Sequence, residues 1–159
     1  MYKYTLPLPP LLLEMLNTGR WPKNSEEAST QQYEAQWVPR AQVSAFCLRD
    51  AIYLLSPPFL TVRESALANP SYWLAANNGM GAARGLDMDL AIDLAEFEIG
   101  DDSSLVLDYR NSMERPQVLC NYWKAIPEKR GSSVLSDSLV PIWQVVAPDF
   151  PTMVKQLGL

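Results

Sequence analysis

The stretch DLAIDLAEFEIGDDSSLVLDYR, from Asp89 to Arg110, decides how the rest of the chain is interpreted. Apolar and polar residues alternate in its first half, which is typical of a strand with one buried face. After Ala95 the apolar positions change phase, so we expect a β-bulge or bend near Ala95–Glu96. The segment GDDSS is typical of a turn, because Asp and Ser side chains bond nearby amides and Gly100 permits a positive φ. The stretch therefore predicts two strands joined by an acidic turn.

Patterns on either side of this stretch predict one α+β domain over residues 1–159. We expect a single central antiparallel or mixed sheet, with flanking helices on one of its faces. Helices are predicted after Pro9 and Pro10 with an end at Gly19, from Asn24 with Glu27 closing a capping box, from Pro39, over residues 61–68, and from Asp149. The other strands are predicted over residues 51–58, 104–110, 117–123 and 141–146, with a loop over residues 128–133.

The composition is that of a soluble globular protein, with 48% hydrophobic and 19% charged residues. Cys47 and Cys120 lack the spacing of metal ligands, and their apolar surroundings predict two buried thiols in a reducing compartment. The apolar N-terminus is interrupted by prolines and contains Glu14, so we do not interpret it as a signal peptide. No apolar run has the length of a membrane span. We therefore expect a cytoplasmic location and no membrane partner.

The negative charge is concentrated in one segment of the sequence. Residues 86–109 contain eight acidic residues and no Lys or Arg, whereas the rest of the chain has ten acidic and thirteen basic residues. The sequence contains no basic stripe of the kind that would predict binding to nucleic acid. An acidic surface would attract a basic protein, although the same acids could instead keep a sheet edge solvated and prevent edge-to-edge pairing. The candidate partner contacts are Asp87, Asp89, Asp93, Glu96 and Glu98.

The residue inventory restricts the possible chemistry. The chain has no histidine, which excludes Ser–His–Asp and Cys–His sites, and we expect no metal and no cofactor. Asp101 and Asp102 are adjacent, so a turn explains them better than a pair of catalytic carboxylates. Gly79 and Gly81 are followed by no lysine, so a flexible loop explains them better than a phosphate site. An enzyme that uses carboxylates alone is nevertheless a further hypothesis.

Several aromatic and charged residues have both a structural and a functional interpretation. We expect Trp123 and Trp143 in strands to belong to the core. The same assignment is preferred for Trp21, Trp37 and Trp73, although exposed tryptophans could anchor a partner. Asp108 and Arg110 share one strand face, which predicts a polar clamp rather than a ligand site.

The segment IGDDSSLVLDYRNSMERPQVLCNYW resembles the SUKH superfamily, which includes bacterial immunity proteins and fungal Smi/Knr-type regulators of cell-wall assembly. The closing segment WQVVAPDFPTMVKQLGL is similar to the last helix of that family. The positions that carry the resemblance in this chain are Gly100, Asp101, Asp102, Leu107, Asp108, Tyr109, Arg110, Pro116, Val118, Trp123 and Trp143.

The resemblance implies an α+β fold with one central sheet and no enzymatic activity. For bacterial members it implies immunity, in which the protein binds and neutralises a cognate toxin, often a nuclease or deaminase. For the fungal branch it implies a regulatory or scaffold protein that binds cellular clients. It also implies that the motif residues, among them Asp101, Asp102 and Asp108, serve the fold. The oligomeric state stays open.

Overall fold

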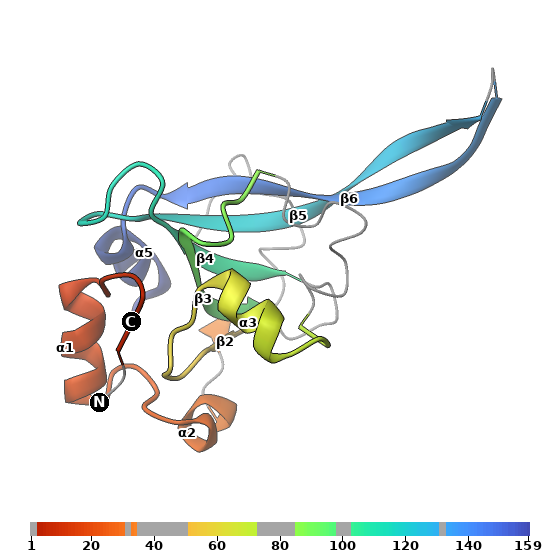
Figure 1. The fold of residues 1–159 in the computed structure, drawn as a ribbon. Helices are drawn as coiled ribbons and strands as arrows, with labels where there is room; N and C mark the ends of the chain where they lie inside the picture. The colour runs from red at the N-terminus through yellow and green to blue at the C-terminus, as the bar shows by residue number, and fades with distance from the viewer. Residues whose placement is uncertain (1–2, 31–32, 35–50, 73–84, 98–102, 131–132) are drawn as a thin grey trace.

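The computed structural model describes residues 3–30, 33–34, 51–72, 85–97, 103–130 and 133–159. Its centre is a six-stranded sheet in which each strand pairs antiparallel with its neighbour in sequence, in the order β1-β2-β3-β4-β5-β6 (Figure 1). Helices pack on this sheet, so the predicted α+β class is confirmed. Within the described ranges, none of the helices is long and apolar enough to cross a membrane.

The described elements follow the expected order, except for a two-residue strand at Tyr33–Glu34 that the sequence did not predict. The described helices are α1 (Pro10–Thr18), α2 (Ser25–Thr30), α3 (Val62–Ala68) and α5 (Phe150–Leu157). The strands are β1 (Tyr33–Glu34), β2 (Ala51–Leu54), β3 (Ala91–Phe97), β4 (Ser104–Asp108), β5 (Gln117–Arg130) and β6 (Ser133–Ala147). The helix predicted from Pro39 lies outside the described residues, as do Trp37, Cys47, Trp73, Gly79 and Gly81.

Local start and stop signals set the helix ends as the sequence predicts. Pro10 occupies the first turn of α1, and Gly19 ends that helix with φ 75°, a left-handed conformation that favours glycine. Thr61 and Glu64 form a reciprocal capping box at the start of α3. The Asp149 side chain accepts from the Thr152 N–H at 2.9 Å and so caps α5.

The cap of α2 differs in one bond from the expected capping box. Asn24 Oδ1 accepts from the Glu27 N–H at 2.9 Å, as predicted. Glu27 Oε2, however, accepts from the N–H of Lys23 at 2.8 Å. The returning bond therefore reaches one residue further back than a standard box, with the same effect of satisfying a free N–H.

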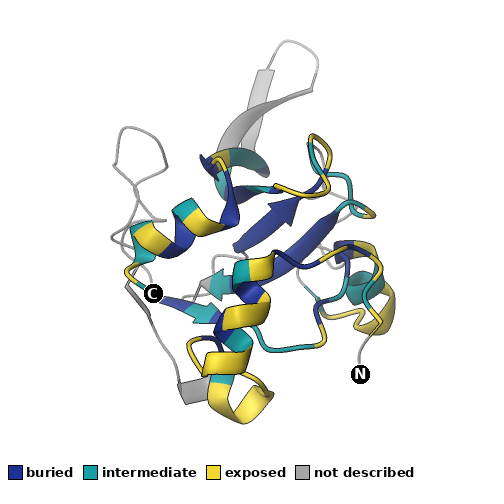
Figure 2. Ribbon diagram, turned by 90° about the vertical axis from the view of Figure 1, so that its left-hand side faces the viewer, coloured by how far each residue is buried: buried dark blue, intermediate teal, exposed yellow. Residues whose placement is uncertain are grey.

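The sheet is buried on both faces, which corrects the expectation of helices on one face. On one face, Leu12 and Met15 of α1 and Phe150 of α5 join the main core. On the other face, Val62 of α3 packs against Ala91, Val106 and Leu119 in a second cluster. Figure 2 shows the buried strands between helices whose outer sides are exposed. Two-sided coverage explains why all five residues of β4 are buried.

The irregularity predicted near Ala95–Glu96 is present. The register between β3 and β4 shifts between Asp93 and Ala95. Leu94 and Ala95 consequently both contribute to the main core, although they are adjacent in sequence. An extra residue in one strand has this effect, because it removes the alternation of faces locally.

The last two strands form a hairpin much longer than predicted. The pairing of β5 with β6 runs from Val118–Ala147 to Arg130–Ser133, so the predicted loop over residues 128–133 is wrong for residues 128–130 and 133. The prediction failed because Pro127, Pro141 and the polar residues between them resemble turn signals. In Figure 1 the outer half of this hairpin projects away from the body of the protein.

Candidate functional site

A pocket of about 720 Å³ opens beside α2 and α3 and is lined on its inner side by residues of β2 and β3. Its walls include the aromatic residues Tyr53, Phe59 and Tyr72. Two carboxylates, those of Asp93 and Glu96, line it as well, and the described lining residues include no Lys or Arg. Mostly apolar walls with a few convergent polar groups are typical of a ligand site.

Asp93 is the most enclosed polar group of this pocket, with 5% of its surface exposed. The Tyr72 hydroxyl donates to Asp93 Oδ2 at 2.6 Å, and Ser104 Oγ–H donates to the same oxygen at 3.2 Å. The other carboxyl oxygen, Oδ1, is buried without a hydrogen-bond partner. A buried polar atom of this kind is rare in native proteins and calls for a physical explanation.

Burial first, and then the neighbouring negative charge of Glu96, raise the pKa of Asp93 to about 8. The hydroxyls of Tyr72 and Ser104 oppose this shift, because they donate to the charged form. The pKa of Tyr72 is raised as well, first by burial and then by Asp93. Asp93 therefore holds its proton around neutral pH, and the pocket contains a neutral acid that can lose a proton.

The strands next to β3 hold this arrangement in place. Ser104 is fully buried on β4, and its N–H donates to Asn121 Oδ1 of β5 at 2.8 Å. The hydroxyl of Ser104 in turn donates one of the two hydrogen bonds that Asp93 Oδ2 accepts. Three neighbouring strands thus contribute to one polar cluster inside an otherwise apolar sheet.

The position of Asp93 corrects its assignment as an exposed partner contact. The alternation in β3 correctly separates Asp93 from Ile92 and Leu94, but its face is covered by α3 and by the segment after α3 that ends in Tyr72. Nothing in the spacing of charges shows that α3 covers this face. The one available signal was that Asp93 lies between apolar residues in a strand that a sheet could bury on both sides.

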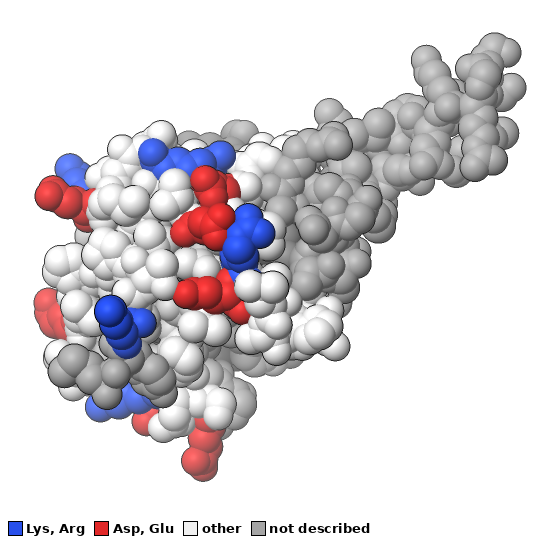
Figure 3. Space-filling model, in the orientation of Figure 1, with Lys and Arg blue, Asp and Glu red and all other residues white. Residues whose placement is uncertain are grey.

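Two further acids of the segment that the structure describes, Asp89 and Asp108, lie beside basic side chains. Asp89 makes an exposed ion pair with Arg63 of α3, with Nε to Oδ1 at 2.6 Å. The hydrogen bond and charge of Asp89, together with the charge of Asp87, raise the pKa of Arg63. The pKa of Arg110 is raised by its bond to Asp108 and also by Asp87. Figure 3 accordingly shows acidic and basic side chains next to each other on this face.

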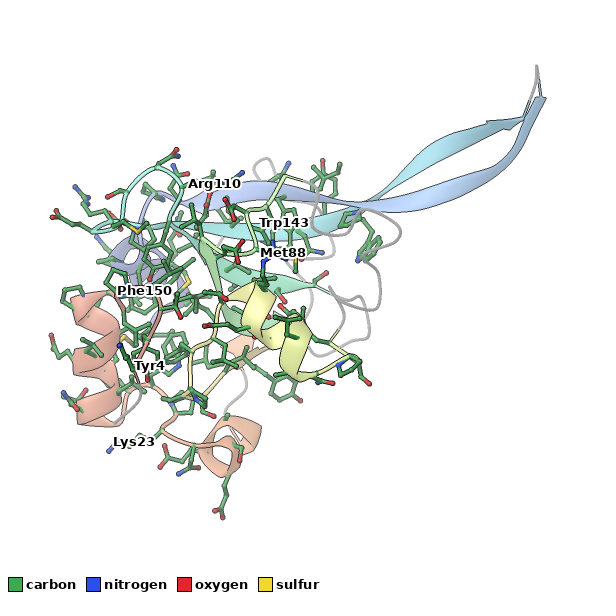
Figure 4. The ribbon with its side chains drawn as sticks, viewed as in Figure 1. Tyr4, Lys23, Met88, Arg110, Trp143 and Phe150 are labelled. Atoms are coloured by element: carbon green, nitrogen blue, oxygen red, sulfur yellow. The ribbon has the colours of Figure 1, made fainter. Side chains whose placement is uncertain are left out.

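The predicted clamp of Asp108 and Arg110 is present. Arg110 Nε and Nη2 each donate to one oxygen of Asp108 at 2.9 Å, and the Arg110 N–H donates to Oδ1 at 3.2 Å. Asp108 is buried and Arg110 lies at the surface, on the side of the sheet that also carries Met88 and Trp143 (Figure 4). The residue between them, Tyr109, points to the opposite side, where its hydroxyl donates to Pro7 O at 2.6 Å.

The tryptophans divide between the two faces. Trp21 is fully buried, donates from Nε1 to Leu55 O at 2.8 Å, and packs on Phe150 with ring centroids 5.7 Å apart. Trp123 and Trp143 are only partly buried and pack against the second cluster. The core assignment is therefore correct for Trp21 and incomplete for the other two.

The remaining candidates add no described chemistry. Glu98, Gly100, Asp101 and Asp102 lie outside the described residues. Cys120 is a buried thiol that donates to Asn121 O at 3.3 Å. In the described ranges, nowhere do three or more potential metal ligands come together.

Comparisons of the chain with protein-family models, with curated proteins and with solved structures found no match. The resemblance to the SUKH superfamily therefore rests on the residues of this chain alone. Two features of the molecule bear on its function, the pocket at Asp93 and the projecting hairpin.

Proposed function

We propose that this protein is a non-enzymatic binding protein of the SUKH immunity type, which neutralises a cognate bacterial toxin of the nuclease or deaminase class by direct contact. The observation that carries the binding role is the projecting β5–β6 hairpin. The immunity role comes from the resemblance of the segment around Leu107–Arg110 to that family. A cytoplasmic location belongs to the same proposal.

The hairpin supports a binding role because, among the described residues, the backbone of its outer half pairs only within the hairpin itself. The pairing of β4 with β5 ends at Leu105–Cys120, and from Asn121 to Arg130 the described partner of β5 is β6 alone. An isolated two-stranded ribbon is marginally stable in water, and its edges offer unpaired backbone groups. A partner that adds a strand, or that covers one face of the ribbon, would supply the missing contacts.

Charge supports a basic partner less strongly than the sequence alone indicates. Arg63 and Arg110 flank the acidic segment and pair with Asp89 and Asp108. The chain still carries a net charge of −5, which favours the approach of a basic domain at low salt. We therefore assign the rate of association to charge, and the stability of the complex to the hairpin.

A carboxylate enzyme is the second candidate, and the pocket provides a specific observation in its favour. Asp93 and Glu96 line one cleft, and the pKa of Asp93 is raised, as expected for a general acid. Against this, Tyr72 and Ser104 both donate to Oδ2 of Asp93, and the carboxyl is nearly enclosed. These features are more typical of a polar group fixed by hydrogen bonds than of an acid that protonates a leaving group. A binding protein is therefore favoured over an enzyme.

The test is an affinity capture from the lysate of the source organism with the wild-type chain and a hairpin-trimmed variant. The variant replaces residues 125–139 by Asn-Gly, a two-residue turn suited to closing the paired strands at Lys124–Val140. A stoichiometric basic polypeptide that wild type retains and the trimmed variant loses would support the proposal. Equal recovery by both, or recovery of several housekeeping proteins only, would contradict it and favour the scaffold alternative.

The capture needs a control for a changed surface. Leu67→Ser alters an apolar side chain of α3 that is 79% exposed, without touching the hairpin. This variant should recover the partner as wild type does. Washing at rising salt separates the two contributions, since charge-driven contacts weaken with ionic strength.

A further inference from the structure

We propose that the pocket at Asp93 is a binding site for a small organic amine, with its ammonium group on the Asp93 carboxylate and its apolar body against the aromatic walls. This activity is independent of the protein partner. It rests on the lining of the pocket, on the unpaired carboxyl oxygen, and on the charge of the groups around it.

The unpaired oxygen indicates what is missing from the site. Oδ2 of Asp93 receives two hydroxyl donors, whereas Oδ1 is buried with none. Once Asp93 has lost its proton, Oδ1 can only accept, so a ligand for the ionised carboxyl must donate a hydrogen bond. An ammonium group offers three donors.

The charge of the lining selects a cation among the possible donors. Asp93 and Glu96 both contribute to the pocket, and its described lining residues include no basic side chain. An alcohol could donate to Oδ1, but only a cation also gains from two nearby carboxylates in a site sheltered from water.

The walls specify the rest of the ligand. Tyr53, Phe59 and Tyr72 line the pocket, and aromatic faces attract organic cations as well as apolar carbon. A volume of about 720 Å³ is within the range of sites for small molecules. An arylalkylamine combines a cationic end with an apolar body of this kind.

Binding should displace a proton. The free site holds Asp93 as a neutral acid, surrounded by Glu96 on its own strand, Tyr72 after α3 and Ser104 on β4. When an ammonium group binds, the O–H bond of the carboxyl breaks, its proton passes to solvent, and the carboxylate pairs with the cation. Below the pKa of Asp93, the affinity for the amine should therefore increase about tenfold for each unit by which the pH is raised. Above that pKa the affinity should stay constant.

The experiment titrates the full-length chain with phenethylamine by calorimetry, and with phenethyl alcohol and phenylacetate as neutral and anionic analogues. An alkylammonium group stays charged up to about pH 10, so the ligand does not change between pH 6 and pH 9. We expect the amine to bind at least tenfold more tightly than either analogue at pH 8. We also expect about one proton to be released at pH 6, well below the pKa of Asp93, and about half a proton at pH 8, measured in two buffers of different ionisation enthalpy.

The variant that tests the assignment is Asp93→Asn, which keeps the shape of the side chain and removes its charge. It should lose the preference for the amine and the pH dependence, whereas Asp89→Asn, an acid outside the lining, should bind as wild type does. Should Asp93→Asn not fold, the proton release and the ranking of the three probes on wild type still decide. Equal affinity for amine and alcohol, no binding of the amine, or pH-independent binding would overturn the proposal.

Discussion

Tyr72 and Asp93 are 21 positions apart in the chain, and the Tyr72 hydroxyl donates a hydrogen bond of 2.6 Å to Asp93 Oδ2. This bond joins the segment after α3 to the middle of β3. It lies on the face of the sheet that the alternating pattern of β3 predicts to be exposed to solvent. A run of acids in the sequence thus contains one residue that belongs to the interior.

Asp93 should make the stability of the protein depend on pH. Its pKa is about 8 in the folded state and about 3.8 when unperturbed, so the folded state holds the extra proton between these values. Its contribution is fully present below about pH 4 and is lost as the pH rises through 8. The slope is at most about 1.4 kcal/mol per pH unit.

Asp93→Asn removes this dependence, because the amide does not ionise. Relative to wild type, the variant should gain stability as the pH rises from 5 to 8, in urea unfolding followed by tryptophan fluorescence. Parallel curves for the two proteins would show that Asp93 is not the protonated group.

The clamp at Arg110 should be worth more than the surface pair at Arg63. Arg110→Gln leaves the buried Asp108 carboxylate with only a backbone donor, and we expect it to lower the free energy of unfolding by about 2–3 kcal/mol. Arg63→Gln breaks an exposed pair and should cost at most about 1 kcal/mol. Equal losses in chemical unfolding would show that burial of Asp108 does not govern the pair.

Tyr109 should fix the segment before α1. Tyr109→Phe removes the donor to Pro7 O and leaves the ring in the core, so a loss of about 1–2 kcal/mol is expected. Trypsin should also cleave faster after Lys3 in the variant, because the segment loses its bond to β4. An unchanged cleavage rate would show that Leu6 and Leu8, which are buried, hold the segment without this bond.

Trimming the hairpin should leave the fold intact. Within the described residues, the backbone of residues 125–130 and 133–139 pairs only with the other strand of the hairpin. The variant with Asn-Gly in place of residues 125–139 should therefore unfold cooperatively, with a loss of less than about 2 kcal/mol, in a thermal scan followed by far-ultraviolet circular dichroism. A molten or aggregated variant would mean that the hairpin is part of the domain core.

Local signals in the sequence predicted much of the fold. Asp149 and Gly19 mark helix ends as expected, through bonds or backbone conformations that involve only neighbouring residues. The capping box of Thr61 and Glu64 was not predicted, although it is equally local. The alternation around Ile92 likewise identified its strand and face. Such features depend on chemistry within a few residues, so one sequence suffices for them.

What could not be predicted depends on contacts between distant segments. Arg63 lies 26 positions from Asp89, and their ion pair places a positive charge beside the acidic segment. The burial of Asp93 similarly requires Tyr72, which reaches it from the end of another element. The length of the hairpin was missed because Pro127 and Pro141 are paired within strands, where proline is usually a sign of an end or an edge.

The proposal that the protein neutralises a toxin is tested most simply by inhibition of the captured partner with the purified chain. The partner's toxic activity, on nucleic acid for a nuclease or on a base for a deaminase, would be titrated with wild type and with the hairpin-trimmed variant. We expect the partner to lose its toxic activity completely at one equivalent of wild type, and to lose little of it with the trimmed variant. Full activity of the partner when it is saturated with wild type would contradict immunity.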